Sequence, residues 1–194
     1  MYKAIEIIDD FYTQEQLNIL FDYTSNLYFK PSLQPHLFEK DFATRFQAYP
    51  CYESTEIMHD DFNNLPVYKI LKDNLKSLGF DFYHLHTFFR KIYKSEIEKS
   101  VCSSGAGIRH KDGHDYNLGG LVYLDELSSF KSGTRFFTDE RFKERIQQEQ
   151  DIQIGSKFNR AIIFDCQTSH QAMYDLDIDS RFVQPFFVKL NEED

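Results

Sequence analysis

Cysteine, proline, glycine and tryptophan are all scarce in this sequence. Its 194 residues include three cysteines, five prolines, eight glycines and no tryptophan. Cys51, Cys102 and Cys166 are odd in number and widely spaced, without a CxxC pair, which argues against a disulfide framework or a cysteine-based zinc site. Reduced thiols in the cytoplasm are the simpler interpretation. Because no Pro/Gly-rich linker, repeat or low-complexity tract occurs, we expect one domain over residues 1–194.

Long apolar runs and an excess of basic residues are also absent. No stretch approaches the length of a membrane-spanning helix. Residues 1–14 carry acidic side chains where a signal peptide has a basic start and an apolar run. The formal net charge of −9 disfavours broad neutralisation of a phosphate backbone, so nucleic acid is not an expected partner. Together these absences predict a soluble cytoplasmic protein without a membrane partner, and no feature indicates an oligomeric state.

Phenylalanine and tyrosine, by contrast, are abundant. The chain has 20 Phe and 12 Tyr, and such side chains favour pleated, half-buried strands. Hydrophobic residues make up 41% and charged residues 27%, as in an ordinary globular protein. The length suffices to bury a core without disulfides. Composition therefore predicts a β-rich domain.

The first 80 residues predict two helices with short flanking strands. The expected elements are a strand at 3–8, a helix at 14–27, a loop at 28–42, a strand at 44–49 and a helix at 60–78. Thr13 and Gln16 form a capping box at the start of the first helix. Gly79 is placed to end the second.

From Asp81 onward the pattern is mainly that of strands. The aromatic, alternating segment 81–94 suits one long strand. Other expected elements are a polar loop at 95–106, strands at 107–111, 118–124, 133–137, 161–165 and 181–189, and a charged helical excursion at 138–151. Helices followed by a run of strands predict a mainly β fold with a helical layer. We expect a jelly roll, a double-stranded β-helix of the cupin kind, at about 81–190, packed by N-terminal helices within about 1–80.

Two histidines and one aspartate are candidate metal ligands. His110 and Asp112 lie two residues apart in a predicted strand, so their side chains point the same way. His170 follows another predicted strand after a short polar turn. Two imidazoles and a carboxylate on one face of a metal are typical of non-haem Fe(II) oxygenases. Arg181, at the start of the last predicted strand, would place a cation suited to gripping a carboxylate near that metal.

These residues occur in an order that is known from one protein family. After His110-Lys111-Asp112 come LGGLVYLD at 118–125, SGTRFF at 132–137, the segment 159–164, His170 and Arg181. With this set the sequence resembles the Fe(II)/2-oxoglutarate-dependent dioxygenase superfamily, particularly its prolyl 4-hydroxylase-like branch, over about 107–189. Residues 8–11, ahead of the first helix, resemble the usual opening of that family.

The resemblance implies roles for particular residues and cofactors. His110, Asp112 and His170 would be the catalytic ligands of the iron. Arg181 would bind the distal carboxylate of 2-oxoglutarate. A tyrosine or threonine usually assists it, and the candidates are Tyr123, Thr134 and Tyr93. The implied cofactors are Fe(II) and the co-substrate 2-oxoglutarate, with ascorbate as an optional addition.

The implied reaction couples oxidative decarboxylation of 2-oxoglutarate to hydroxylation of a substrate that the sequence does not identify. A protein side chain, an amino acid or a small metabolite would each serve. Ser132 replaces the first glycine of the family's turn, and Val183 stands where serine is common. These departures keep open a non-catalytic jelly-roll binding module. A cupin-like metal enzyme that does not use 2-oxoglutarate, with His114 as a further ligand, also stays open.

Simpler interpretations exist for each residue. His110 and Asp112 could form a surface pair in a turn-rich loop, and Arg181 could pair with an aspartate of the preceding acidic turn. The occurrence of His110, Asp112, His170 and Arg181 in this order favours the metal site over a surface pair and over a salt bridge. His84 and His86 face the same way on their strand. Packing or a substrate-facing wall is a better expectation for them than a second metal site, since no third ligand is near in sequence.

Overall fold

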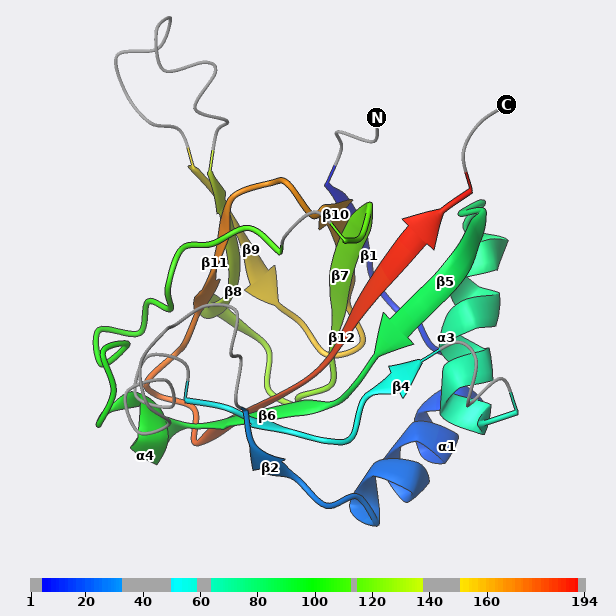
Figure 1. The fold of residues 1–194 in the computed structure, drawn as a ribbon. Helices are drawn as coiled ribbons and strands as arrows, with labels where there is room; N and C mark the ends of the chain where they lie inside the picture. Colours follow the sequence, from blue (N-terminus) through cyan, green and yellow to red (C-terminus); the bar gives the residue numbers. More distant parts are fainter. Residues whose placement is uncertain (1–4, 33–49, 59–63, 113–114, 138–150, 192–194) are drawn as a thin grey trace, which may run out of the picture.

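Two antiparallel sheets, two longer helices and one short helix make up the part of the chain that the computed structural model describes, residues 5–32, 50–58, 64–112, 115–137 and 151–191. The helices α1 and α3 lie side by side on one side of the larger sheet, and the smaller sheet lies on the other (Figure 1). Neither sheet closes on itself within these described ranges. The predicted mainly β, jelly-roll fold with a helical layer is confirmed. The predicted strand at 44–49 and nearly all of the predicted helix at 138–151 lie outside the described residues.

The larger sheet contains nine strands among the described residues, in the order β1-β10-β7-β12-β6-β3-β2, with β5 also paired to β12 and β4 to β5. Its strands are β1 (Glu6–Ile8), β2 (Lys30–Pro31), β3 (Tyr52–Glu53), β4 (Ile57–Met58), β5 (Phe82–Thr87), β6 (Arg90–Tyr93), β7 (Leu118–Tyr123), β10 (Ala161–Asp165) and β12 (Ser180–Leu190). The strands predicted from 118, 161 and 181 correspond to β7, β10 and β12.

The smaller sheet has the order β11-β8-β9, formed by β8 (Ser129–Phe137), β9 (Asp151–Ser156) and β11 (His170–Met173). The regular strand predicted at 107–111 is wrong. That segment runs beside β11 with only two isolated bridges, Ala106↔Met173 and His110↔His170. Their registers differ by one residue, so a bulge interrupts the ladder between them.

The helices are close to expectation. In α1 (Gln14–Ser25) the predicted capping box is present: the Thr13 hydroxyl accepts from Gln16 N at 3.3 Å, and Gln16 Oε1 accepts from Thr13 N at 2.9 Å. The second helix, α3 (Pro66–Ser77), begins at Pro66 rather than 60, because proline suits the first helical turn. A short helix, α4 (Lys94–Ile97), replaces part of the predicted loop at 95–106. No helix within the described residues is long and apolar enough to cross a membrane.

The long strand predicted at 81–94 is interrupted between β5 and β6. Both pieces nevertheless pair with β12, and the register is the same on the two sides of the break. Pro185 of β12 lies opposite the break and has no N–H, so the ladder lacks one bond there. The Pro185 carbonyl still accepts from Phe88 N at 3.3 Å and from the Thr87 hydroxyl at 2.7 Å. The missing donor therefore divides the strand without shifting its register.

Alternate residues of the larger sheet face two different cores. On one face Leu85 and Phe186 pack in the main cluster with the apolar sides of α1 and α3. On the other face Tyr123 and Val183 pack with Phe136 of the smaller sheet. This second face also carries the chemistry-bearing residues described below.

Several short strands were not predicted. They are β2, which falls in the expected loop at 28–42, together with β3, β4, β9 and β11, and β8 begins at Ser129 rather than at 133. These strands pair with partners far away in the sequence. Because their stability comes from tertiary pairing, the local pattern carries little trace of them.

Candidate metal centre

The three predicted ligands come together on two paired segments. His170 is the first residue of β11, and His110 lies opposite it. The N–H of each donates to the carbonyl of the other at 2.9 Å. Asp112 donates its N–H to the Cys166 carbonyl at 3.1 Å, which fixes the chain just beyond the bridge. Backbone pairing thus brings two distant parts of the sequence into one cluster.

The polar atoms of the cluster are close enough to share one ion. His110 Nε2 lies 3.6 Å from Asp112 Oδ1, and His170 Nε2 lies 3.5 Å from Asp112 Oδ2. One ligand atom from each residue lies within 4.8 Å of the other two. Metal–ligand bonds of about 2.0–2.2 Å hold neighbouring ligand atoms roughly 3 Å apart, so only a small adjustment separates this arrangement from a coordinated one.

Backbone carbonyls orient both imidazoles. His110 Nδ1 lies 2.9 Å from the Ile108 carbonyl, and His170 Nδ1 lies 2.9 Å from the Thr168 carbonyl. A carbonyl can only accept, so each Nδ1 carries the hydrogen and each Nε2 presents its lone pair towards Asp112. This is the usual way in which a protein sets the tautomer of a metal-binding histidine.

The protonation states also suit a cation. Burial acts to raise the pKa of Asp112, but the neighbouring His170 and His110 outweigh it, so that the pKa is lowered. Burial lowers the pKa of His170, against the opposing effect of the carboxylate. The Phe164 ring, 4.7 Å from the His170 ring, contributes to that burial. A carboxylate with two imidazoles is the donor set that non-haem Fe(II) sites use, so these residues fit a divalent metal.

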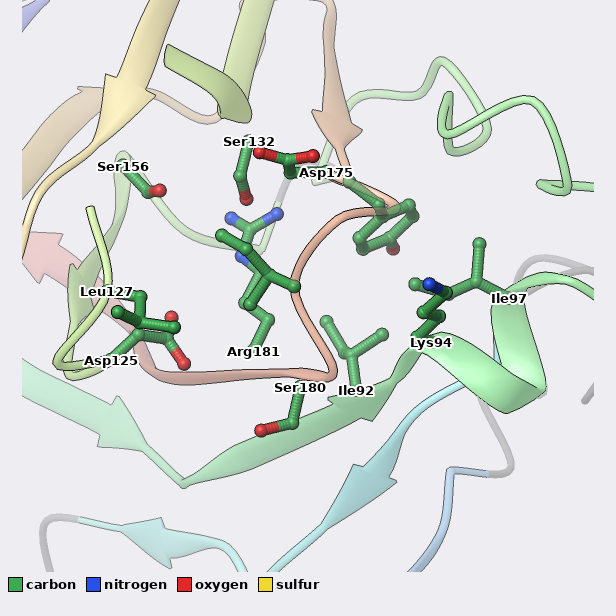
Figure 2. Close-up of a pocket in the computed structure, with 12 residues that line it drawn as sticks. Ile92, Lys94, Ile97, Asp125, Leu127, Ser132, Ser156, Asp175, Ser180 and Arg181 are labelled. Carbon is green, nitrogen blue, oxygen red and sulfur yellow. The ribbon is translucent and has the colours of Figure 1, made fainter. Parts of the chain in front are cut away.

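Arg181 is buried between the sheets, with 6% of its surface exposed. Its Nη1 donates to the carbonyls of Gly133 at 3.2 Å and Met173 at 3.1 Å. Its Nε has no hydrogen-bond partner within the described residues. Figure 2 shows the guanidinium pointing towards Ser132 in a pocket that Asp125 also lines. Burial rules out the simpler interpretation of Arg181 as a surface salt bridge.

Two of the three predicted helpers of Arg181 lie beside it. The Tyr123 ring centroid is 5.1 Å from the Arg181 guanidinium carbon, and the Tyr123 and Thr134 hydroxyls are 2.9 Å apart. Both residues are buried. Tyr93 is 40% exposed and packs on Tyr52 at 5.6 Å between ring centroids. Because it alternates with the residues that face the smaller sheet, it points to the other side.

Comparison with known proteins gives a match in fold but not in sequence. No family model and no curated protein matches the chain. A prolyl hydroxylase from Trichoplax adhaerens, in complex with a hypoxia inducible factor peptide, matches with TM-score 0.63 at 14% identity over 96% of this chain and 84% of its own. A 2OG-Fe(II) oxygenase from Burkholderia pseudomallei gives 0.63 at 11% identity, over 95% and 84%. The chain has the 2-oxoglutarate oxygenase fold.

A third similar structure carries a metal. HygX from Streptomyces hygroscopicus, with nickel and 2-oxoglutarate bound, matches with TM-score 0.58 at 11% identity, over 98% of this chain and 84% of its own. The resemblance that the sequence motifs indicated is thus confirmed at the level of the 2-oxoglutarate oxygenase fold, with prolyl hydroxylases among the matches.

The two departures from the family pattern have structural explanations in this oxygenase fold. The Ser132 hydroxyl donates to the Met173 carbonyl at 3.2 Å, so the hydroxyl is used to tie β8 to β11. Val183 is 2% exposed and belongs to the core between the sheets. Neither removes a residue of the metal cluster. His114, the further ligand considered for a cupin-like enzyme, lies outside the described residues.

Asp125 was not singled out by sequence reasoning. It ends the motif LVYLD, and its carboxylate accepts a hydrogen bond from Phe182 N, next to Arg181. Burial raises its pKa to about 6, although Arg181 and the Phe182 N–H oppose the shift. The acidic residue at the end of this otherwise apolar motif was the signal that could have revealed it.

Proposed function

We propose that the protein is a non-haem Fe(II) oxygenase that couples oxidative decarboxylation of 2-oxoglutarate to hydroxylation of a substrate. The observation that carries the proposal is the convergence of His110, Asp112 and His170, whose ligand atoms lie within 4.8 Å of one another. The oxygenase fold and a buried arginine on the same sheet face support it. Asp112 and the two imidazoles would hold Fe(II) on one face and leave open positions.

The co-substrate would be held by a second group of residues. Arg181 would bind the distal carboxylate of 2-oxoglutarate, because a guanidinium matches a carboxylate in charge and geometry. Its buried Nε, which has no hydrogen-bond partner in the described part of the chain, is a donor for such a group. The hydroxyls of Tyr123 and Thr134, 2.9 Å apart, would assist. Tyr93 is not proposed for this role, since it points away from the other two.

Held by His110, Asp112 and His170, Fe(II) would supply, together with 2-oxoglutarate and dioxygen, the oxidising power for hydroxylation, with succinate and carbon dioxide as the co-products. The chain itself orients the ligands through the Ile108 and Thr168 carbonyls. It also shields His170 from water, since the rings of Phe164 and Phe136 lie 4.7 and 6.0 Å from the His170 ring. Ascorbate would serve to keep the iron reduced between turnovers.

The remaining parts of the proposal concern the domain organisation, the cellular location and the binding partners. We propose that residues 1–194 work as one oxygenase domain, with helical support from about 1–80 and the core at about 81–190. A cytoplasmic location agrees with three free, buried cysteines. The substrate would be a small molecule or a peptide; a peptide is what the Trichoplax prolyl hydroxylase holds. The net charge of −9 argues against nucleic acid.

Succinate formation tests the proposal. Purified protein with Fe(II), 2-oxoglutarate and ascorbate is expected to form succinate, at least at the slow rate of uncoupled turnover. Asp112→Ala should abolish this, whereas Asp115→Ala, which removes an exposed carboxylate nearby, should not. If the wild-type protein binds no iron, or if the two variants behave alike, the assignment is wrong.

A further inference from the structure

The sheet face that carries the metal cluster continues across β12 and β5 as a row of rings. Asp112 Oδ2 would be 3.0 Å from a Cβ built on Gly119 of β7, so the carboxylate lies directly on that glycine. Gly119 is paired with Phe187 of β12, and Phe187 with His86 of β5. Adjacent strands are about 4.8 Å apart, so Phe187 lies one strand spacing and His86 two strand spacings from Gly119.

Four rings form what we call the aromatic wall: His86, Phe88, Tyr116 and Phe187. The Phe187 centroid lies 5.4 Å from that of Tyr116, 5.9 Å from that of His86 and 6.5 Å from that of Phe88. His86 is 8% exposed and Phe88 6%, whereas Tyr116 and Phe187 are partly exposed. Two rings of the wall, those of Tyr116 and Phe187, are therefore open to contact on the sheet face that carries the metal cluster.

One polar atom of the wall lacks a partner. His86 Nε2 is buried and makes no hydrogen bond within the described residues. The Tyr116 hydroxyl lies 3.3 Å from His86 Nδ1, and a Glu56 carboxylate oxygen lies 3.6 Å from Nε2. Leaving a buried hydrogen-bonding atom unsatisfied costs free energy, so this nitrogen marks a position where a ligand would supply the missing hydrogen bond.

The carboxylate decides which nitrogen of His86 carries the hydrogen. Burial lowers the pKa of His86, with Glu56 opposing, so the ring is neutral at neutral pH. A lone pair on Nε2 would face the Glu56 oxygen and be repelled by it. The hydrogen therefore belongs on Nε2, and the Tyr116 hydroxyl donates to Nδ1. The result is a buried N–H donor beside a carboxylate acceptor whose side chain is 59% exposed.

The charges around the wall are mixed. Arg90 pairs with Glu53 at 2.6 Å and lies 5.2 Å from the Phe88 ring. The Lys189 ammonium lies 5.4 Å from the Tyr116 ring. A cationic ligand would meet these two cations and could not accept from His86, and an anionic ligand would meet Glu56. A hydroxyl, by contrast, can accept from the His86 Nε2–H and donate to Glu56 at the same time.

We propose that the aromatic wall is the substrate surface of the oxygenase and selects a neutral ring that bears a hydroxyl group. The ring would lie against Phe187 and Tyr116. Its hydroxyl would accept from His86 Nε2–H and donate to Glu56, whose exposed side chain can move to admit it. This inference rests on the proposed function, because the wall is a substrate surface only if the neighbouring metal cluster is the catalytic iron site.

Three probes that share one ring and differ in one group, together with a peptide analogue, test the proposal. The protein loaded with Zn(II) and 2-oxoglutarate is titrated with cyclohexanol, cyclohexylammonium, cyclohexanecarboxylate and N-acetylproline amide. The readout is the NMR signal of the His86 ring, assigned by its loss in His86→Phe. Cyclohexanol should shift this signal and bind at least about tenfold more tightly than either charged ring, because only its hydroxyl satisfies both partners.

Variants give the second arm. Glu56→Gln changes an exposed side chain, so folding should be preserved, and it should weaken cyclohexanol binding about fivefold to tenfold. Asp73→Asn, which removes an exposed carboxylate from α3 on the other side of the sheet, should have no effect. Equal affinities for all probes, preference for a charged ring or for the peptide analogue, or no shift of the His86 signal would each overturn the inference. Failure of the Zn(II) protein to bind 2-oxoglutarate would instead overturn the proposed function.

Discussion

Gly119 of β7 lies directly against the carboxylate of Asp112. A Cβ at this position would stand 3.0 Å from Asp112 Oδ2 and 3.4 Å from Cys166 Sγ. The glycine thus leaves the space in which the carboxylate meets the two imidazoles. The neighbouring Gly120 points to the opposite face, where a Cβ would stand 2.6 Å from the Ile162 carbonyl oxygen. Two adjacent glycines serve two different needs, one in the site and one in the core.

Substituting these two glycines should separate an effect on metal affinity from an effect on folding stability. Gly119→Ala should displace the carboxylate and weaken binding of Mn(II), a spectroscopic substitute for iron, by about tenfold with little loss of stability. Gly120→Ala should instead overpack the core and lower the free energy of unfolding by about 1–3 kcal/mol. Mn(II) titration by electron paramagnetic resonance and urea unfolding measure the two effects. Equal metal affinity in wild type and Gly119→Ala would contradict the assigned contact.

Metal binding should stabilise the protein through the same three residues. A ligand that binds only the folded state at a hundred times its Kd adds about 2.7 kcal/mol. We therefore expect Zn(II) or Mn(II) to raise the melting temperature of the wild-type protein, and a chelator to reverse the effect. In His170→Ala the rise should be lost. A rise of the same size in that variant would place the ion elsewhere.

Arg181→Lys should reduce affinity for 2-oxoglutarate while leaving the metal site intact. Lysine keeps the charge but loses the planar pair of donors, so we expect about tenfold weaker binding of 2-oxoglutarate to the Mn(II) protein. Mn(II) affinity should not change. Arg160→Lys, which alters a partly exposed arginine paired with Asp9, is the matched control. Undiminished 2-oxoglutarate affinity in Arg181→Lys would remove this residue from the co-substrate site.

Asp125 should make stability depend on pH in the acid range. Its pKa is raised from 3.8 to about 6 by burial, so the folded state holds the proton more tightly than the unfolded state. The corresponding stabilisation is complete below the unfolded pKa of 3.8 and is lost as the pH rises through about 6. At neutral pH the partly buried carboxylate is therefore a cost, at most about 3 kcal/mol.

Asp125→Asn removes that cost while its amide oxygen can still accept from Phe182 N. We expect the variant to be more stable than the wild type by about 1–2 kcal/mol at pH 7.5, and the difference to vanish near pH 4. Urea unfolding at several pH values measures this. A stability difference that does not change with pH would mean that the carboxyl group is not buried as described.

Part of the site was predictable because it depends on the spacing of residues that are close together in the sequence. His110 and Asp112 point the same way at a spacing of two even though their segment is not a regular strand, since the bulge lies before His110 and not between the two residues. The capping box at Thr13 acts within one turn and was predicted correctly. The break within 81–94 was not predicted, because the proline opposite it, Pro185, lies in the partner strand β12.

The sequence by itself determined a β-rich fold, its two main helices and the residue types able to hold a metal, because periodicity and side-chain chemistry act locally. Only the tertiary structure decided which residues meet: the reciprocal bonds between His110 and His170, Tyr123 beside Arg181 but not Tyr93, and His86 two strands away from the metal cluster. Those contacts depend on the register between strands far apart in the chain. Register is set by the packing of whole sheet faces rather than by any one segment.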